Sequence, residues 1–399
     1  MSAPPVPARY RPALRPGVLL SEPLLHGPDL VHLIKNTGSG RSFKVGPREH
    51  FLISRMDGTR TVEEIGADYA GRFGRRLGDS HWRSLLSLLG TRELLDGRPG
   101  PADVPGDDPA PGTGSPAASA AGPPAAAATA ATAPVPGPRA PRGLLSGSVR
   151  LVADADATAA RLHRLTRHLL SPAALLPLLA LAVHMEATLL LRFGELLDGT
   201  AALFTAPALL LAVATLLWLS TALHELAHGV LAHHHGGRVS EIGLRWRLPV
   251  VIMYCTVDDF LHLPGRRGRI ATAGAGAAVN LLFLLPFFAV WALAPLDHAT
   301  RQALGALLLL GSVQAFTMLL PLPPLDGYRI ASQLLGATGL AASTAAYLGL
   351  VLRRSPAAAR YPRRARRAYA GYAATVALTL VLLAAAASAV AHHYLTNAP

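Results

Sequence analysis

Four long segments of the sequence contain no Asp, Glu, Lys or Arg, and this limits the possible folds more than any other feature. The segments are residues 199–223, 270–296, 302–325 and 368–391. A helix needs about 20 apolar residues to cross a hydrocarbon core of about 30 Å, where each backbone polar group must be bonded within the segment. The sequence therefore predicts a multi-pass α-helical membrane protein.

Two further segments are apolar but interrupted. Residues 169–191 are long enough to form a first span, and His184 and Glu186 in their middle must then face other helices rather than lipid. Residues 331–352 contain three glycines and lie between basic residues, which favours a helix that lies on or dips into the membrane. With the second span extended to 199–232, we expect five spans and one interfacial helix.

Basic residues predict the orientation of these spans. They cluster within residues 150–167, 238–269 and 353–367, whereas the loops at 192–198 and 297–301 hold one arginine each. A cytoplasmic N-terminus followed by five spans places all three clusters in the cytoplasm, as the positive-inside rule requires. We therefore expect a cell-membrane protein whose net charge of +13 reflects contacts with membrane lipid headgroups rather than with nucleic acid.

Residues 1–97 are too polar to enter a membrane and predict a small cytoplasmic α+β domain. No basic segment followed by a short apolar one opens the chain, so a cleavable signal peptide is not expected. Thr61 and Glu64 have the spacing of a capping box, in which each side chain bonds a free amide at a helix start. A hairpin and three helices suggest a winged-helix-like unit; a generic folded cap is the alternative. The expected elements are strands at 30–34, 42–45 and 94–95 and helices at 49–56, 61–73 and 81–89.

Residues 98–149 consist mainly of Pro, Ala and Gly. They have too few large apolar side chains to offset the entropy of ordering. This composition predicts a disordered linker that leads to a membrane domain at 150–399.

The inner end of the second predicted span carries the sequence His224-Glu225-Leu226-Ala227-His228. Residues four apart share one helix face, so both imidazoles can bind one Zn²⁺ while Glu225 reaches the metal-bound water as general base. In a span otherwise free of charge, these side chains are costly unless they are paired or bind a metal. A structural polar cluster is the alternative to zinc.

A catalytic zinc site needs a third protein ligand, and the single cysteine of the chain leaves histidines and carboxylates as candidates. His234 has the spacing of an extended protease signature, but Leu231 stands where that signature needs glycine. His235 lies about 10 Å from His228 along the helix, too far to share an ion. Asp326 is the better candidate, because the prolines before it break the helix and let its carboxylate turn inward.

These residues resemble the site-2 protease family of intramembrane zinc metalloproteases. Its members combine H-E-x-x-H on one span with P-x-x-x-L-D-G on a later one, here residues 321–327. The resemblance implies that one Zn²⁺ is bound by His224, His228 and Asp326, and that Glu225 is the catalytic base.

The chain departs from the family pattern at two positions. Ala277 stands where the family often has proline in G-P-x-x-N, a motif that ends here at Asn280, and Met318 replaces an asparagine that helps to hold substrate. These departures put substrate positioning in doubt but change no zinc ligand. We expect Asn280 either to offer substrate an amide contact or to bond to helix backbone.

Residues 239–256 alternate enough to predict a β-hairpin between the second and third spans. An exposed strand edge there could hold an unwound substrate by strand addition. A packed loop is the alternative.

The N-terminal domain resembles the PqqD-like winged-helix domains that bind leader peptides in the maturation of ribosomal peptide natural products. The likeness rests on the hairpin, on residues 51–65 and on the helices after them. Together with the catalytic motifs it implies a peptide zinc metalloprotease that cleaves a precursor peptide near the cytoplasmic face. The alternatives are regulated cleavage of an anti-sigma factor or other membrane protein, and a non-catalytic membrane scaffold.

Overall fold

The structure is a computed structural model that describes residues 9–97, 146–247 and 250–396. The chain forms two compact units: an N-terminal unit of Met1–Leu25 and Asp29–Gly137, and a C-terminal unit of His26–Pro28 and Pro138–Pro399. The expected linker lies outside the described residues as far as position 145. Its last four residues, 146–149, belong to the strand β5 (Ser146–Arg150), because their backbone pairs with the next strand in the same sheet.

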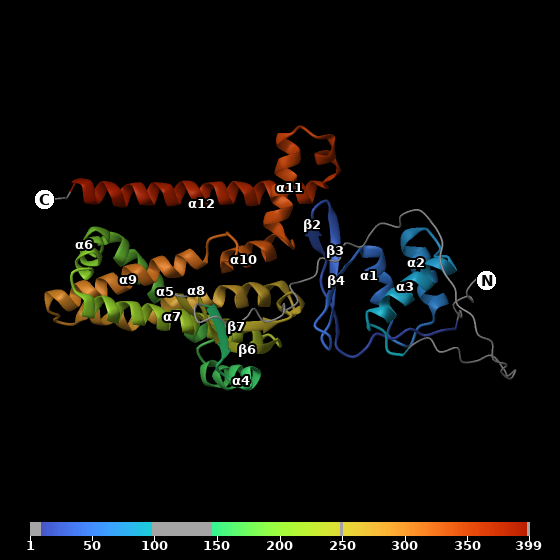
Figure 1. The fold of residues 1–399 in the computed structure, drawn as a ribbon, viewed down its shortest axis with the longest axis horizontal. Helices are drawn as coiled ribbons and strands as arrows, with labels where there is room; N and C mark the ends of the chain where they lie inside the picture. The colour runs from blue at the N-terminus through green and yellow to red at the C-terminus, as the bar shows by residue number, and fades with distance from the viewer. Residues whose placement is uncertain (1–8, 98–145, 248–249, 397–399) are drawn as a thin grey trace. The chain divides into compact units, whose positions relative to one another are not determined.

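The N-terminal unit has a four-stranded sheet followed by three helices (Figure 1). The strand β3 pairs with each of the others, and the predicted hairpin is confirmed as the pair β3–β4, in which Ile34 lies opposite Phe43. The strand expected at 94–95 is reduced to an isolated bridge between Leu95 and Leu14. The elements are β1 (Val18–Leu20), β2 (Leu24–His26), β3 (Asp29–Asn36), β4 (Ser42–Val45), α1 (Pro47–Ile53), α2 (Val62–Phe73) and α3 (Asp79–Thr91).

The predicted capping box is present at the start of α2. The Glu64 amide donates to Thr61 Oγ1 at 3.2 Å, and the Thr61 amide donates to Glu64 Oε2 at 2.7 Å. The helix ends at Gly74, whose φ of 67° lies in the left-handed region that favours glycine. Ile65, on the inner face of α2, is fully buried in the core between the helices and the sheet.

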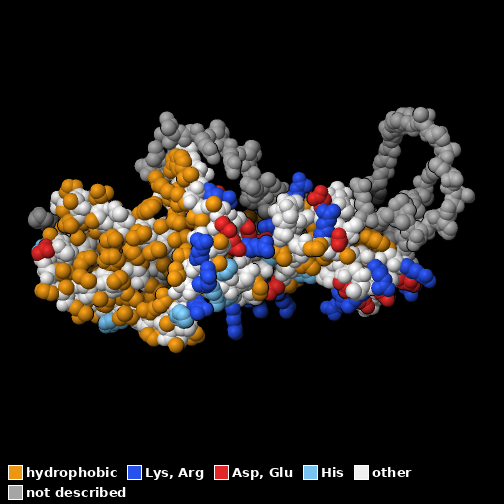
Figure 2. Space-filling model, turned by 90° about the horizontal axis from the view of Figure 1, so that it is seen from below, with side chains coloured by type: hydrophobic (Ala, Val, Ile, Leu, Met, Phe, Trp, Pro, Cys, Tyr) orange, Lys and Arg blue, Asp and Glu red, His pale blue; other side chains and the backbone are white. Residues whose placement is uncertain are grey.

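The C-terminal unit consists mainly of helices (Figure 1). In the described part of the chain, four helices are long and apolar enough to cross a membrane: α5, α7, α8 and α12. Figure 2 shows hydrophobic side chains spread over the surface of the helical part. The expected class, a helical membrane protein, fits these dimensions. The helices are α4 (Ala155–Thr166), α5 (Pro172–Leu191), α6 (Phe193–Leu203), α7 (Pro207–His234), α8 (Arg266–Leu293), α9 (His298–Met318), α10 (Asp326–Leu335), α11 (Leu340–Leu352) and α12 (Arg363–Thr396), with short 3₁₀ turns η1 (Phe260–His262) and η2 (Pro356–Arg360).

Two predicted spans differ from the helices that form. The second, expected at 199–232, begins only at Pro207, because proline favours the first turn of a helix and residues 199–203 belong to α6. The fourth, expected at 302–325, is the helix α9, which stops at Met318 before the prolines. Without the apolar residues after Met318, α9 is not among the four membrane-length apolar helices. The count of five spans therefore stays a prediction. The other three expected spans, 169–191, 270–296 and 368–391, correspond to α5, α8 and α12.

The interfacial helix expected at 331–352 is wrong as a single element. It is divided between α10 and α11, with Gly336 and Gly339 in the turn. Both glycines have a φ of 60°, a left-handed conformation that ends one helix before the next begins. The apolar helix α11 is only 13 residues long.

Two strands between α7 and α8 in the sequence form a three-stranded sheet with β5. The predicted hairpin is confirmed as β6 (Arg238–Arg247) and β7 (Val250–Asp258), which pair antiparallel. The sheet order is β5-β6-β7, so β7 is an edge strand of this sheet. The role of that edge in substrate binding stays a prediction.

Candidate metal centre

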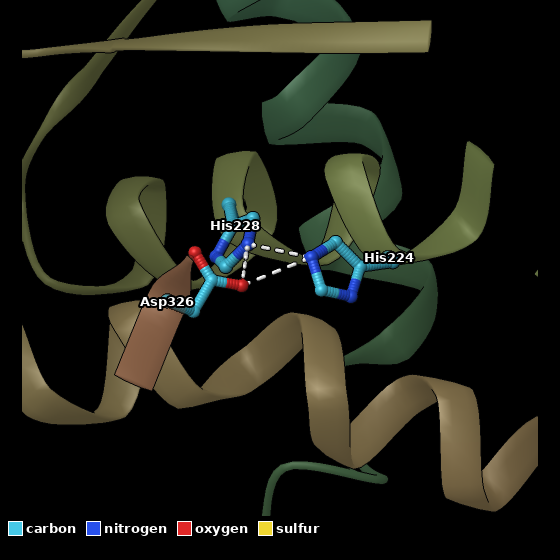
Figure 3. A group of neighbouring side chains, drawn as sticks. All are labelled: His224, His228 and Asp326. Atoms are coloured by element: carbon cyan, nitrogen blue, oxygen red, sulfur yellow. Dashed lines mark hydrogen bonds and ion pairs between the residues drawn. The ribbon is translucent and has the colours of Figure 1, made fainter. Parts of the chain in front are cut away.

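The structure brings three of the predicted site residues together (Figure 3). His224 and His228 lie one turn apart on α7, and Asp326 is the first residue of α10. His224 Nε2 is 3.0 Å from Asp326 Oδ2, His228 Nε2 is 3.1 Å from the same oxygen, and the two nitrogens are 3.2 Å apart. The three ligand atoms thus converge on one point.

This group fits a zinc ion. All three residues are buried, with exposed fractions of 3%, 5% and 6% for His224, His228 and Asp326. Two imidazole nitrogens and one carboxylate oxygen are a known ligand set for catalytic zinc, and bonds of about 2.0–2.2 Å place tetrahedral ligands about 3.3–3.6 Å apart. The observed separations of 3.0–3.2 Å are a few tenths of an ångström below that range. A buried group with three ligands can hold a metal ion and leave one position for water or substrate.

The carboxylate of Asp326 is available as a ligand at neutral pH. Burial raises the pKa of Asp326, but the contacts with the His224 and His228 imidazoles outweigh burial and hold the pKa below its usual range. A metal ligand must be deprotonated to bind.

A backbone carbonyl of α8 orients the imidazole of His228. His228 Nδ1 lies 2.7 Å from the carbonyl oxygen of Thr272. A carbonyl only accepts hydrogen bonds, so Nδ1 carries the proton and Nε2 is left to face the metal position. Such a contact fixes both the tautomer and the ring orientation of a ligand.

A side chain of α8 also contacts the imidazole of His224. Asn280 Nδ2 lies 3.2 Å from His224 Nδ1, and Ser220 Oγ donates to Asn280 Oδ1 at 3.0 Å. Asn280 is buried, with an exposed fraction of 1%. The structure therefore gives Asn280 a contact with a ligand imidazole, which is neither of the two contacts expected from the sequence.

Two glycines allow the helices to approach the centre. A Cβ atom at Gly276 on α8 would overlap the His224 ring, and a Cβ atom at Gly327 would overlap the backbone of Leu319 and Leu320. Glycine at these positions lets α8 pack against the ligand and lets the chain turn tightly before Asp326. The sequence feature that indicates this packing is the spacing of four between Gly276 and Asn280, because it places both residues on one face of α8.

Glu225 lies next to His224 on α7 and is half-buried. Its negative charge, after burial, is the second cause that raises the pKa of the Cys255 thiol to about 12. Cys255 belongs to β7, so Glu225 lies near this strand.

A cavity of about 410 Å³ adjoins the centre at His228. His228 forms part of its wall, together with Cys255 and Val257 of β7 and Arg329 of α10. The cavity is large enough for several atoms of an extended peptide beside the ligand His228.

The other polar residues considered from the sequence lie outside this group. His234 Nδ1 is 3.0 Å from His163 Nε2, at the end of α7 beyond the site, and His235 caps the same helix. Glu186 accepts a hydrogen bond from Ser312 Oγ at 2.7 Å, so it faces another helix as expected. His184 lies against the ring of Phe288, with ring centroids 6.1 Å apart.

Comparison of the chain with protein-family models, with curated proteins and with solved structures gave no match. The function proposed below therefore follows from the residues and geometry of the centre.

Proposed function

We propose that the protein is an intramembrane zinc metalloendopeptidase that hydrolyses a peptide bond near the cytoplasmic face of the membrane. The observation that carries this proposal is the buried group His224, His228 and Asp326 on and beside a helix of membrane-spanning length. Glu225 lies on the same helix, next to one ligand. Buried, convergent ligands in an apolar helix are costly unless a bound ion or proton compensates them.

Each residue of the proposed centre has a defined task in this reaction. A zinc ion bound by the three ligands would lower the pKa of a water molecule towards about 7 and polarise the scissile carbonyl. Glu225 accepts a proton from the attacking water and donates it to the departing amine. Asn280 and the Thr272 carbonyl hold the two imidazoles in orientation, and Asp326 supplies the negative ligand.

The substrate must be extended at the scissile bond, because a helical peptide hides its carbonyl groups. The edge strand β7 lines the cavity beside His228 and pairs with only one strand of its sheet, β6. Pairing with β7 would hold an unwound segment by main-chain hydrogen bonds, leaving its carbonyl near the ligands.

The proposed substrate is a ribosomally made precursor peptide. The N-terminal unit has the hairpin and three helices expected of a leader-binding winged-helix-like domain, and it would raise the local concentration of substrate by binding the leader. Cleavage of an anti-sigma factor or other membrane-anchored protein is the competing assignment for the same chemistry.

The test compares the full-length wild type with Glu225→Gln and Asp326→Ala. We expect about one zinc per chain in wild type and in Glu225→Gln, and less in Asp326→Ala. Only the wild type should cleave peptides encoded beside the gene. A Glu225→Gln protein that binds zinc but does not cleave separates loss of the base from loss of the metal.

Other outcomes would change the assignment. Zinc binding without cleavage of any peptide encoded beside the gene would favour a membrane-anchored protein as the substrate. Such a protein would then be tested for cleavage. Absence of zinc from the wild type would contradict the proposed chemistry and favour a scaffold.

A further inference from the structure

The cavity beside the metal centre is lined by residues of several elements. They include Thr256 and Val257 of the strand β7, and Arg329 and Ser332 of the helix α10. A peptide paired with the β7 backbone would point alternate side chains to either side of its own strand. Some side chains of such a peptide would therefore enter the cavity that α10 also lines.

Arg329 is the only Lys, Arg, Asp or Glu among the residues that line this cavity. The remaining lining residues are apolar or neutral apart from the ligand His228. A cavity wall with one arginine and no carboxylate favours a negatively charged group in the ligand.

The geometry of Arg329 leaves its guanidinium accessible. Its side chain is 55% exposed, and Arg329 Nη1 lies 3.6 Å from Asp326 Oδ1. This separation is too long for a hydrogen bond, so Asp326 orients the guanidinium without occupying its donors. Because Asp326 is a ligand of the centre, a group bound to Arg329 would lie within a few residues of the scissile bond.

We propose that this cavity is a specificity subsite for a peptide carboxylate, with Arg329 as the residue that selects it. The substrate class is an extended peptide that carries Asp, Glu or its own C-terminal carboxylate close to the cleaved bond. This inference rests on the proposed peptidase function and adds the substrate preference. Arg329 acts as a binding residue, since guanidinium and carboxylate form charge-assisted, two-point hydrogen bonds.

The test uses one set of decapeptides that differ only at one position, as Glu, Gln or Lys, each with a free and an amidated C-terminus. Full-length wild type is assayed for cleavage, and Glu225→Gln is assayed for binding by fluorescence anisotropy of the labelled peptides. We expect the Glu peptide to be preferred over the Gln peptide by about tenfold, the scale of one charged hydrogen-bonded contact near solvent. Preference for a free C-terminus with no Glu–Gln difference would identify the chain end as the source of the carboxylate.

Variants of Arg329 separate substrate selection from support of Asp326. Arg329→Gln should reduce the Glu-to-Gln ratio to about one while the protein keeps its zinc, and Arg329→Lys should restore part of the ratio. Arg366→Gln, an exposed arginine on α12 that does not line the cavity, is the matched control and should keep the ratio. A purely structural Arg329 would instead lower zinc content, or cleavage of all peptides equally.

The two proposals fail in distinguishable ways. Cleavage or binding without carboxylate preference in the wild type, or a preference that survives in Arg329→Gln, would overturn the subsite alone. Absence of cleavage combined with carboxylate-selective binding to Glu225→Gln would retain the subsite and overturn the peptidase function.

Discussion

At the scale of single residues, the support of His224 by Asn280 can be tested directly. When His224 binds a metal through Nε2, its Nδ1 carries a proton and needs an acceptor. The amide of Asn280 can provide its oxygen by exchanging its two ends, because Ser220 Oγ can accept as well as donate. Asn280→Leu should therefore weaken zinc binding about 10–100-fold. A competition titration with a chromophoric chelator measures this affinity.

Asn280→Asp is the informative control, since a carboxylate can accept the Nδ1 proton. We expect it to keep most of the zinc affinity that Asn280→Leu loses. Equal affinity in wild type and Asn280→Leu would show that the contact between Asn280 and His224 does not support the metal centre.

The reactivity of the Cys255 thiol tests another contact between single residues, the effect of the Glu225 charge on β7. Burial, followed by the charge of Glu225, raises the pKa of Cys255 to about 12. At a pH below this value the thiolate is the minor form, so alkylation of the folded protein should be slow at pH 8 and rise about tenfold per pH unit. Glu225→Gln removes one of the two causes and should lower the pKa, which speeds alkylation at any pH below it.

The measurement is the rate of iodoacetamide labelling in detergent from pH 8 to 10, followed by mass spectrometry. Cys255 is the only cysteine of the chain, so one signal suffices. A rate at pH 8 equal to that of a free thiol, or unchanged by Glu225→Gln, would contradict the proximity of Glu225 to this strand.

At the scale of elements, the contact between α7 and α8 depends on Gly276. A methyl group there would overlap the His224 imidazole, so Gly276→Ala should displace the ring or separate the helices. We expect loss of zinc and destabilisation of about 1–3 kcal/mol, as for other overpacked sites. Zinc content and thermal unfolding in detergent measure the two effects.

Gly274→Ala is the matched control on the same helix. Its Cβ would lie 3.7 Å from Ile330 Cδ1, an ordinary contact. This variant should keep zinc and gain up to about 1 kcal/mol from helix propensity. Equal loss of zinc in both variants would mean that α8 tolerates no side chain here for reasons other than His224.

Some features of these elements could be predicted from the sequence, and others could not. Helical periodicity identified His224, Glu225 and His228 on one helix, and prolines identified the turn before Asp326, because both signals are local. The contact between Asn280 and His224 joins residues 56 positions apart and depends on how two helices pack, which no local pattern specifies. The break between α10 and α11 had a local signal in Gly336 and Gly339, but glycine also occurs inside helices.

At the scale of the whole molecule, the candidate metal centre constrains the path of the chain. Thr272 of α8 lies at the centre because its carbonyl oxygen contacts His228 Nδ1. The end of α8 at Leu293 lies about 32 Å from Thr272 at 1.5 Å per residue. Asp326 is again 3.1 Å from His228. The chain must return over this distance between Leu293 and Asp326, and α9 is the helix that covers it.

We therefore predict that α9 crosses the membrane although it is less apolar than the four candidate spans. Burial explains how it can do so, since Leu307, Leu308 and Ala315 of α9 are fully enclosed by other helices. With α9 included the spans number five, and the arginines at 353–367 return to the side of the N-terminus. A tag at the C-terminus should then lie on the opposite side from residues 1–97.

Reporter fusions can decide between five crossings and four. A C-terminal alkaline phosphatase should be active and a C-terminal green fluorescent protein dark, whereas the same reporters placed after Arg354 should behave in the opposite way. Four crossings would reverse both results and leave seven arginines, between 353 and 367, outside the cytoplasm. That outcome would require α9 to turn back within the membrane, which conflicts with the return of Asp326 to His228.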